Sequence, residues 1–449
     1  MALSMLPPAA PERDGNSAQL LVGGVDLFPL ALQAIEQAKQ EVRIETYIFA
    51  DDSVGEAFCE AMCNAVARGV TVRLVLDGFG GTEGIQIWVP RLKQHGVKVR
   101  VFRPEGFVFK PSPKRLRRMH RKMIAVDGKT AFVGGINLID DMNHENEREE
   151  LMRANARVEK PVHFSFGKSG ALSARDLQVN IDLLDQDLGP RYDFSVALQG
   201  PVVHDIWHSM EWLWLQIGPG GKVTDTFNSD WWKKRIAQYR DTLAQHRAQA
   251  MPPVAGKVKV QLAVRDNFRL PRRIERAYLQ AFGRAQSTVI LANAYFLPGR
   301  KMRNAIVAAR KRGVVVKLLL QGRVEYRFQH YATQYLYSSL LEVGVEVYEY
   351  LPGFLHAKVA VIDSNWATVG SSNLDPLSSL FAREANVIVR NREFACQLKK
   401  ELKQAIEQGG RQVLPHDHAR RPFKARALSW VCYKLMLLAV FLGAFGSRY

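Results

Sequence analysis

The sequence contains few cysteines and no segment typical of an export signal. Four cysteines occur among 449 residues, and they are scattered: Cys59, Cys63, Cys396 and Cys432. Cys59 and Cys63 lie one helical turn apart on an apolar face, which favours buried thiols over a zinc site. So few cysteines in a long chain are typical of a reducing compartment. Residues 1–17 lack a basic segment followed by an apolar one, so we expect no export.

Acidic residues are scarce relative to basic ones. Lys and Arg total 62 against 44 Asp and Glu, which gives a formal net charge of +18. This excess favours a polyanionic partner, either nucleic acid or an anionic membrane surface, and charge alone does not choose between them. The apolar fraction of 47% is ordinary for a globular protein. The length exceeds a single ordinary core and indicates two or three domains.

One polar pattern occurs twice, beginning at His120 and again at His356. The two copies have matching residue types at identical spacing: His120, Lys122, Asp127, Gly134, Gly135 and Asn137, then His356, Lys358, Asp363, Gly370, Ser371 and Asn373. Apolar residues on both sides of each aspartate predict two short buried strands joined by a turn. Strand alternation places the histidine and the lysine of each copy on the same face.

Strands and helices alternate in both halves, which predicts α/β layers with a largely parallel sheet. We expect a mobile start, a helix over residues 26–39, and a capping box from Ser53 to Glu56 at the next helix. The predicted strands before the motifs are 42–49, 70–76, 97–102, 289–294, 314–320 and 345–350. A glycine-rich stretch at 78–84 does not match a dinucleotide fingerprint. We interpret it as a loop that edges the substrate cleft at the carboxyl end of a strand.

An internal repeat is visible outside the motifs. Residues 67–76, Ala-Arg-Gly-Val-Thr-Val-Arg-Leu-Val-Leu, match residues 311–320, Lys-Arg-Gly-Val-Val-Val-Lys-Leu-Leu-Leu. The repeat predicts a two-fold pseudo-dimer whose two motifs meet at one interface. The expected division is an N-terminal lobe at 1–218 with a polar insertion at 140–190, a linker at 219–256, a C-terminal lobe at 257–415 and a tail at 416–449.

Two segments are candidates for membrane contact. Trp231 and Trp232 stand beside basic residues in the linker and fit either a lipid headgroup layer or packing against a lobe. Residues 427–445 are strongly apolar apart from Lys434. Four basic residues precede them: Arg420, Arg421, Lys424 and Arg426. This order favours membrane attachment, as an interfacial helix or a marginal span, and the alternative is a helix buried against the body of the protein.

The two histidines suit phosphodiester chemistry through a covalent intermediate. An imidazole titrates near a pKa of about 6.5, so one histidine can attack phosphorus while the other protonates the leaving oxygen. These roles require environments that push the two pKa values apart. Other side chains of the pattern can bind the phosphoryl oxygens, which would make a metal unnecessary. They are Lys122, Lys358, Asn137 and Asn373.

The duplicated pattern resembles the signature of the phospholipase D superfamily, His-x-Lys-x4-Asp-x6-Gly-[Gly/Ser]-x-Asn present twice, and both copies match at every position. Within the superfamily the sequence is most similar to bacterial cardiolipin synthases, particularly the B type, which lacks the N-terminal transmembrane helices of the A type. This finer resemblance rests on residues 118–122, 192–201, 293–296 and 366–378. It implies an α/β fold in which two phospholipase D-like αβα sandwich lobes form one pseudo-two-fold, bilobal enzyme.

The resemblance also implies roles for residues. The catalytic motif residues would be His120, Lys122, Asp127, His356, Lys358 and Asp363, although the turn position of the two aspartates indicates structural hydrogen bonding instead. His120 is expected to be the nucleophile, and His356 the general acid and then base. In the family a carboxylate past each motif orients a histidine. Glu384 fits the second copy, and Asp193 is the best match for the first.

The implied activity moves a phosphatidyl group from phosphatidylglycerol to a histidine with release of glycerol, and then to a second phosphatidylglycerol to give cardiolipin. We expect no metal or cofactor, an anionic phospholipid substrate, a membrane surface as partner, and a place on the cytoplasmic face of the bacterial inner membrane. The first rival is a hydrolytic phospholipase D or nuclease, and the second is a non-catalytic scaffold. The apolar tail and the Trp pair argue for lipid over nucleic acid, and two intact motifs argue against a scaffold.

Overall fold

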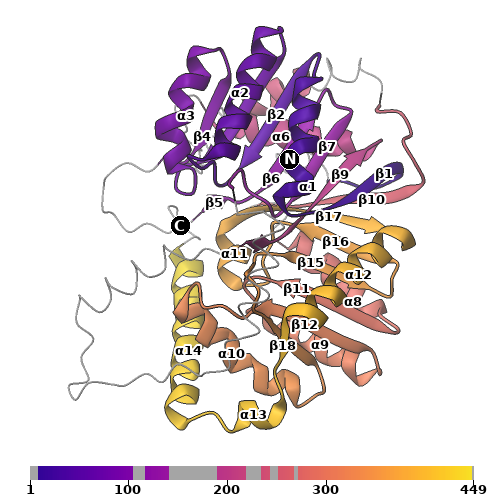
Figure 1. Cartoon of the computed structure of the whole chain (residues 1–449), viewed down its shortest axis with the longest axis vertical. Coiled ribbons are helices and arrows are strands. Elements are labelled where there is room, and N and C mark those ends of the chain that lie inside the picture. Colours follow the sequence, from indigo (N-terminus) through magenta and orange to yellow (C-terminus); the bar gives the residue numbers. More distant parts are fainter. Residues whose placement is uncertain are drawn as a thin grey trace, which may run out of the picture.

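The computed structural model describes residues 9–104, 117–140, 190–218, 234–242, 251–266 and 272–446. Two lobes lie one above the other along the long axis of the molecule (Figure 1). The expected insertion at 140–190 lies almost wholly outside the described residues, and so do Trp231 and Trp232 of the expected linker.

The N-terminal lobe is built on a sheet with a parallel outer part. Its parallel strands are β2 (Glu41–Thr46), β3 (Thr71–Asp77) and β4 (Lys98–Phe102), joined by α2 (Ser53–Ala67) and α3 (Thr82–Gln94). Antiparallel strands then continue the sheet: β6 (Lys122–Val126), β7 (Thr130–Gly134) and β9 (Phe194–Gln199). The helices α1 (Gly23–Glu36) and α6 (Val202–Gln216) complete the lobe, together with two short strands, β5 (Arg118–Met119) and β8 (Arg191–Tyr192).

The C-terminal lobe repeats this plan. Its parallel strands are β11 (Thr288–Asn293), β12 (Val315–Gln321) and β13 (Glu346–Tyr350), with α9 (Arg300–Lys311) and α10 (Arg327–Leu341) between them. The antiparallel strands are β15 (Lys358–Ile362), β16 (Trp366–Gly370) and β17 (Ala382–Arg390). Other elements are α8 (Arg273–Arg284), β14 (Phe354–Leu355), α11 (Pro376–Phe381), α12 (Arg392–Gly409), β18 (Gly410–Gln412), α13 (Pro415–Ala419) and α14 (Phe423–Gly446).

One sheet runs through both lobes. Its strand order is β18-β13-β12-β11-β15-β16-β17-β10-β1-β9-β7-β6-β2-β3-β4, in which β1 (Glu12–Val22) and β10 (Val258–Arg265) form the central pair. Outward from β1 the strands are β9, β7, β6, β2, β3 and β4, and outward from β10 they are β17, β16, β15, β11, β12 and β13. Each strand of one series has the same place in its lobe as the matching strand of the other, and only β18 has no counterpart in this order. The expected pseudo-two-fold arrangement is therefore confirmed, with its axis between β1 and β10.

The expectation of a mobile start is wrong for residues 12–22. β1 pairs antiparallel with β9 of its own lobe and with β10 of the other. Leu20 and Leu21 are buried in the core, and the buried Asn16 amide donates to the Val258 carbonyl at 3.1 Å. The strand is hard to recognise in the sequence because its apolar residues come only at the end, after a bulge near Gly15. β1 thus couples the two lobes.

Two further expectations need correction. The sheet is mixed, because only the three outer strands of each lobe pair in parallel while the motif hairpins and the central strands pair antiparallel. The cap of α2 is Asp52 and not Ser53: its carboxylate accepts a hydrogen bond from the Gly55 N–H at 2.8 Å. Asp52 precedes the helix with extended backbone angles, whereas Ser53 already lies inside it.

Buried side chains form a core in each lobe and one that continues across the junction. The shared core includes Leu20 and Val196 from the first lobe with Leu262 and Val387 from the second. Cys59 and Cys63 are buried in the core of the N-terminal lobe, as expected from their spacing. Among the described residues no group of three or more His, Cys, Asp or Glu side chains is arranged to hold a metal ion.

The last helix, α14, lies along α10 on the outside of the C-terminal lobe (Figure 1). Cys432, Tyr433 and Met436 are buried against the lobe, and the Tyr433 ring stacks on Tyr335 with 4.6 Å between centroids. Large apolar side chains on the rest of the helix are exposed: Phe423, Leu428, Trp430, Val431, Leu435, Leu437, Leu438 and Phe441. No helix within the described ranges is long and apolar enough to cross a membrane.

Candidate active site

The two motif hairpins occupy equivalent places in the lobes. β6 and β7 pair around a turn at Asp127, and β15 and β16 pair around a turn at Asp363. Both aspartates have a positive φ, 51° and 50°, in the left-handed region that Asp tolerates better than most residues. The prediction of two strands joined by a turn is confirmed in both copies.

The motif aspartates lie at the far ends of these hairpins. The Asp127 carboxylate accepts hydrogen bonds of 2.8 to 2.9 Å from the backbone N–H groups of residues 39–41. Asp363 accepts equivalent bonds of 2.8 to 2.9 Å from residues 286–288. A strand of five residues separates each aspartate from its lysine by roughly 16 Å. The structure therefore does not bring these two aspartates into the site, and each ties its hairpin to the start of a neighbouring strand.

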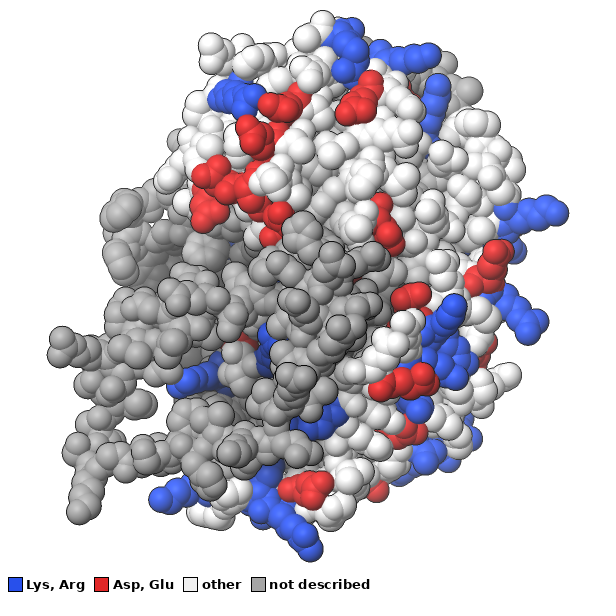
Figure 2. Space-filling model, viewed as in Figure 1, with Lys and Arg blue, Asp and Glu red and all other residues white. Residues whose placement is uncertain are grey.

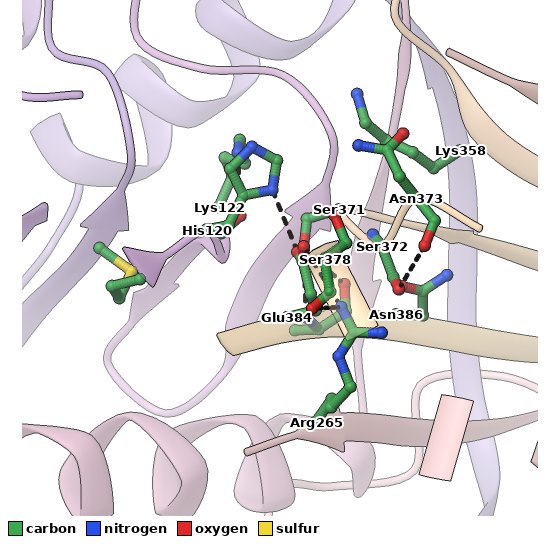
Figure 3. A network of polar contacts seen from close by, with 12 residues as sticks. His120, Lys122, Arg265, Lys358, Ser371, Ser372, Asn373, Ser378, Glu384 and Asn386 are labelled. Atoms are coloured by element: carbon green, nitrogen blue, oxygen red, sulfur yellow. Dashed lines mark hydrogen bonds and ion pairs between the residues drawn. The ribbon is translucent and has the colours of Figure 1, made fainter. Parts of the chain in front are cut away.

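His120 is held at the junction of the lobes. β5, directly before it, pairs parallel with β17 of the other lobe, and the His120 N–H donates to the Arg383 carbonyl at 2.9 Å. Nδ1 of His120 lies 3.1 Å from Oε2 of Glu384, a fully buried residue of β17 (Figure 3). Arg265 in turn lies 3.6 Å from the other Glu384 oxygen.

His356 is held in the equivalent way from the opposite side. β14, directly before it, pairs parallel with β8, and the His356 N–H donates to the Tyr192 carbonyl at 3.0 Å. Nδ1 of His356 lies 2.6 Å from Oδ2 of the buried Asp193. A carboxylate at Nδ1 fixes the tautomer of each imidazole and leaves Nε2 for reaction.

The pairing of carboxylates with histidines differs from the expected one. Glu384, past the second motif, contacts the histidine of the first, and Asp193, past the first motif, contacts the histidine of the second. The exchange follows from the short strands β5 and β14, each of which crosses to a strand of the other lobe. The sequence shows a carboxylate after each motif but contains no signal for which lobe's histidine it faces.

The second small residue of each motif accommodates the carboxylate. A Cβ at Gly135 would lie 2.4 Å from both oxygens of Asp193, so only glycine leaves room there. At the matching position of the second copy, the Ser371 hydroxyl donates to Glu384. The signature allows glycine or serine at this position, and the two copies use one each. Glycine leaves space for the carboxylate of Asp193, whereas serine donates a hydrogen bond to the carboxylate of Glu384.

Both lysines lie beside their histidines and are buried. Lys122 Nζ donates to the His120 carbonyl at 2.9 Å. Lys358 Nζ contacts the His356 carbonyl and lies 3.4 Å from Asp193. Both asparagines are also buried, and the Asn137 side chain accepts from the Ile48 N–H at 3.2 Å. Oδ1 of Asn373 has no hydrogen-bond partner among the described residues.

Comparison with known proteins identifies the family of this chain. A family model described as "Cardiolipin synthase, PLD-like domain" matches residues 31–160 and 278–406, one match for each lobe. Cardiolipin synthase B of Shigella flexneri is 33% identical over 401 residues, which cover 89% of this chain and 83% of that protein. The chain belongs to the cardiolipin synthase family of phospholipase D-like enzymes.

Two other proteins place this cardiolipin synthase family member more broadly. The probable cardiolipin synthase YwiE of Bacillus subtilis (strain 168) is 25% identical, with 88% of this chain and 66% of that protein covered. The crystal structure of phosphatidylserine synthase from Haemophilus influenzae Rd KW20 superposes with a TM-score of 0.62 at 12% identity, and the match covers 94% of both chains. The latter likeness concerns the fold alone.

Burial dominates the electrostatics of this phospholipase D-like site. It lowers the pKa of His120, with Lys122 adding to the effect. Burial also holds the pKa of His356 well below its usual value, helped by Lys358 and Arg191. Both imidazoles are therefore neutral in the free enzyme near pH 7. The approach of an anionic phosphodiester favours the charged form of each and so raises both pKa values.

The same burial shifts the partner groups. It lowers the pKa of Lys122 to about 7 and raises the pKa of Asp193 to about 6. The pKa of Glu384 is lowered although burial acts to raise it, because His120 and Arg265 lie alongside. Glu384 thus stays ionised, and the charge on Lys122 is sensitive to pH near neutrality.

Several residues around the histidines did not emerge from the sequence. The Tyr47 ring meets the His120 ring edge-on with 4.8 Å between centroids. An oxygen of Asp77 accepts from the Met119 N–H at 2.7 Å, and Gln321 accepts from the Leu355 N–H at the same distance, so each fixes the residue before a histidine. Asp77 and Gln321 end β3 and β12. Alignment of the repeat at 67–76 with 311–320, extended by one residue, would have found them.

Proposed function

We propose that this chain is a phosphatidyltransferase that makes cardiolipin from two molecules of phosphatidylglycerol. The observation that carries the proposal is the paired arrangement of His120 and His356, each held at Nδ1 by a buried carboxylate of the other lobe and flanked by a lysine. Two imidazoles with free Nε2 atoms provide a nucleophile and an acid, and the lysines provide positive charge for the phosphoryl oxygens.

The proposed first step forms the covalent intermediate. Nε2 of His120 attacks phosphorus and forms an N–P bond. The bond between phosphorus and the oxygen of the glycerol headgroup breaks. His356, which gains a proton when the anionic lipid binds, donates it from Nε2 to that oxygen. Lys122 and Lys358 bind the remaining phosphoryl oxygens, with Asn137 and Asn373 beside them.

The proposed second step reverses the roles. A hydroxyl of a second phosphatidylglycerol gives its proton to Nε2 of His356, and its oxygen attacks phosphorus. The N–P bond breaks, so that cardiolipin leaves and His120 is restored. Water taking the place of the lipid alcohol would give phosphatidic acid instead, which is the hydrolytic alternative.

We propose that α14 attaches the enzyme to a membrane surface. Its exposed apolar side chains lie on the side that does not pack on the lobe, and Arg420, Lys424 and Arg426 stand at its start. Basic residues followed by an apolar stripe favour an interfacial helix on anionic lipid. Among the described residues on the face seen in Figure 2, basic side chains are interspersed with acidic ones. We place the enzyme on the cytoplasmic face of the bacterial inner membrane.

Mass spectrometry of lipid products tests the activity. The purified protein is incubated with phosphatidylglycerol vesicles, alongside His120→Ala as control. Cardiolipin together with free glycerol, both lost in the control, is the expected result. Phosphatidic acid without cardiolipin would show a hydrolase, and no lipid product at all would contradict the proposed function.

A further inference from the structure

The loops that follow β3 and β12 differ although the lobes are related by pseudo-symmetry. In the N-terminal lobe, the loop after β3 contains glycines that lie directly against backbone and ring atoms, so side chains would not fit at these positions. A Cβ at Gly80 would lie 2.6 Å from the Tyr47 ring, and one at Gly81 would lie 2.7 Å from the Asp77 carbonyl oxygen. The equivalent loop after β12 carries the side chains of Arg323, Glu325 and Tyr326.

These side chains border a pocket in the C-terminal lobe. The pocket is partly open to solvent, and its lining includes Tyr295, Gln321, Glu325, Tyr326, His330 and Thr333. Two lining residues hold the chain on either side of His356. Gln321 accepts from the Leu355 N–H at 2.7 Å, and Ala294 donates its N–H to the Ala357 carbonyl at 2.9 Å. The lining of the pocket is therefore tied to the backbone on either side of His356.

The polar groups of the pocket suit a neutral polyol. Glu325 accepts from the Tyr295 hydroxyl at 2.6 Å, and its other oxygen lies 3.8 Å from Arg191. Arg191 therefore balances the charge of Glu325. The carboxylate oxygens still have lone pairs that can accept hydrogen bonds from a ligand. Nε2 of Gln321 is buried and has no hydrogen-bond partner among the described residues. A hydroxyl both donates and accepts, so neighbouring hydroxyls of one ligand can satisfy both groups.

Reaction geometry places an alcohol beside His356. Attack on phosphorus and departure of the leaving oxygen are roughly in line, so with His120 as nucleophile the alcohol leaves and enters beside His356. We propose that the pocket is the headgroup subsite, which holds the released glycerol and then the glycerol headgroup of the acceptor lipid, with Glu325 as a specificity-determining residue. This inference rests on the proposed function and adds to it the group that selects a polyol.

The test is exchange of alcohols into phosphatidylglycerol vesicles. Isotope-labelled glycerol and 1-propanol compete for the full-length enzyme, and mass spectrometry gives the ratio of glycerol to propanol incorporated. Propanol has no second hydroxyl, so a site built to hydrogen-bond hydroxyls discriminates against it. We expect Glu325→Ala to lower that ratio by about tenfold, with propanol transfer retained, and Glu325→Gln to lower it less because the amide keeps an acceptor oxygen. Retained propanol transfer also shows that the variant is folded.

The control is a matched carboxylate outside the pocket. Glu346 on β13 likewise accepts from a tyrosine, Tyr348, at 2.7 Å and pairs with Lys317 at 3.0 Å, at the protein surface. Glu346→Ala should leave the ratio unchanged. An unchanged ratio in Glu325→Ala, from an enzyme whose wild type makes cardiolipin, would overturn this inference alone. A wild type that hydrolyses phosphatidylglycerol without exchanging either alcohol would overturn the proposed transfer, and this inference with it.

Discussion

At the scale of single residues, the site concentrates ionisable groups where water is excluded. Lys358 and Glu384 are buried completely, and His120 is the more exposed of the two histidines, with 17% of its side chain accessible. Burial penalises charge, so the protonation of these groups depends on their neighbours. An anionic lipid in the site would stabilise the positive charges of a protonated histidine and of the lysines at the same time. We therefore expect the free enzyme to respond to pH more steeply than the enzyme with lipid bound.

A pH profile of kcat/KM tests the charge on Lys122. Its pKa is lowered to about 7 by burial, so the side chain is charged below about pH 7 and loses its proton above that value. Since kcat/KM reports the free enzyme, it should already fall with rising pH where His356, the proposed acid, loses its proton, and it should fall more steeply once Lys122 loses its own above about pH 7. The acid limb should lie below pH 6.5, because the lowered pKa keeps His120 neutral to that point. Lys122→Arg should remove the steeper fall above pH 7, because an arginine keeps its charge there, and an unchanged profile would mean that another group titrates in this range.

The motif residues that we propose for the chemistry were predictable because their spacing is repeated. His120, Lys122, His356 and Lys358 all came from two matched patterns, and the structure brings the four together. Tyr47 was not predicted, because its contact with His120 depends on the end of β2 meeting the end of β5. Contacts of this kind come from packing between elements far apart in the sequence, which residue spacing does not report.

At the scale of elements, the motif aspartates anchor hairpins. Asp363 accepts three backbone hydrogen bonds at the start of β11, and Asp363→Ala should lower the free energy of unfolding by about 3 kcal/mol, at roughly 1 kcal/mol for each bond. Burial acts to raise the pKa of Asp363, but these bonds lower it overall. The stabilisation is therefore present above the unfolded pKa of about 3.9 and is lost as pH falls through the lower folded value.

Thermal denaturation of Asp363→Ala at pH 7 and at pH 3 measures this effect. The deficit relative to wild type should shrink at pH 3, and the folded fraction should retain its turnover per molecule. Asp417→Ala is the control, since that side chain is 63% exposed in α13. A variant with unchanged thermal stability and no turnover would instead give Asp363 a catalytic role.

The helix α14 presents two apolar sides with different expected roles. On its exposed side, Leu438→Glu should weaken binding to anionic vesicles by about tenfold, since burying a leucine contributes about 1.5–3 kcal/mol. Val254→Glu is the matched control, because it adds the same charge at an apolar side chain that is 75% exposed elsewhere. Flotation with phosphatidylglycerol vesicles gives both values. Equal binding of Leu438→Glu and wild type would contradict attachment through this helix.

The two alternatives predicted for this segment were membrane attachment and burial against the body. One side of α14 packs on the lobe, as the second alternative predicted. The leucines on the other side are exposed, and for that side we propose attachment to a membrane. The sequence could not separate the two, because apolar residues surround this helix without the periodicity that marks a single buried face. The position of α10 decides which side is covered.

At the scale of the whole molecule, the repeat predicted two lobes with one shared site, and that arrangement is confirmed. The joining of the lobes was not predicted. β1 looked like a mobile start yet lies at the centre of a sheet that continues through both lobes. The exchange of Glu384 and Asp193 between lobes has the same origin, since both depend on pairing between strands distant in sequence. Neither lobe alone contains a histidine together with its carboxylate.

Trapping of the covalent intermediate tests this shared site most directly. The substrate is a phosphatidyl ester with a phosphorus label and a p-nitrophenol leaving group, which departs without being protonated. Formation of the covalent intermediate from it therefore requires the nucleophile and not the general acid. Labelled protein is measured after alkaline quenching, where an N–P bond survives. Glu384→Gln, like His120→Ala, should lose the label. Asp193→Asn, like His356→Ala, should keep it while turnover falls by a factor on the order of 10² to 10⁴. Label lost in Asp193→Asn and kept in Glu384→Gln would contradict this account.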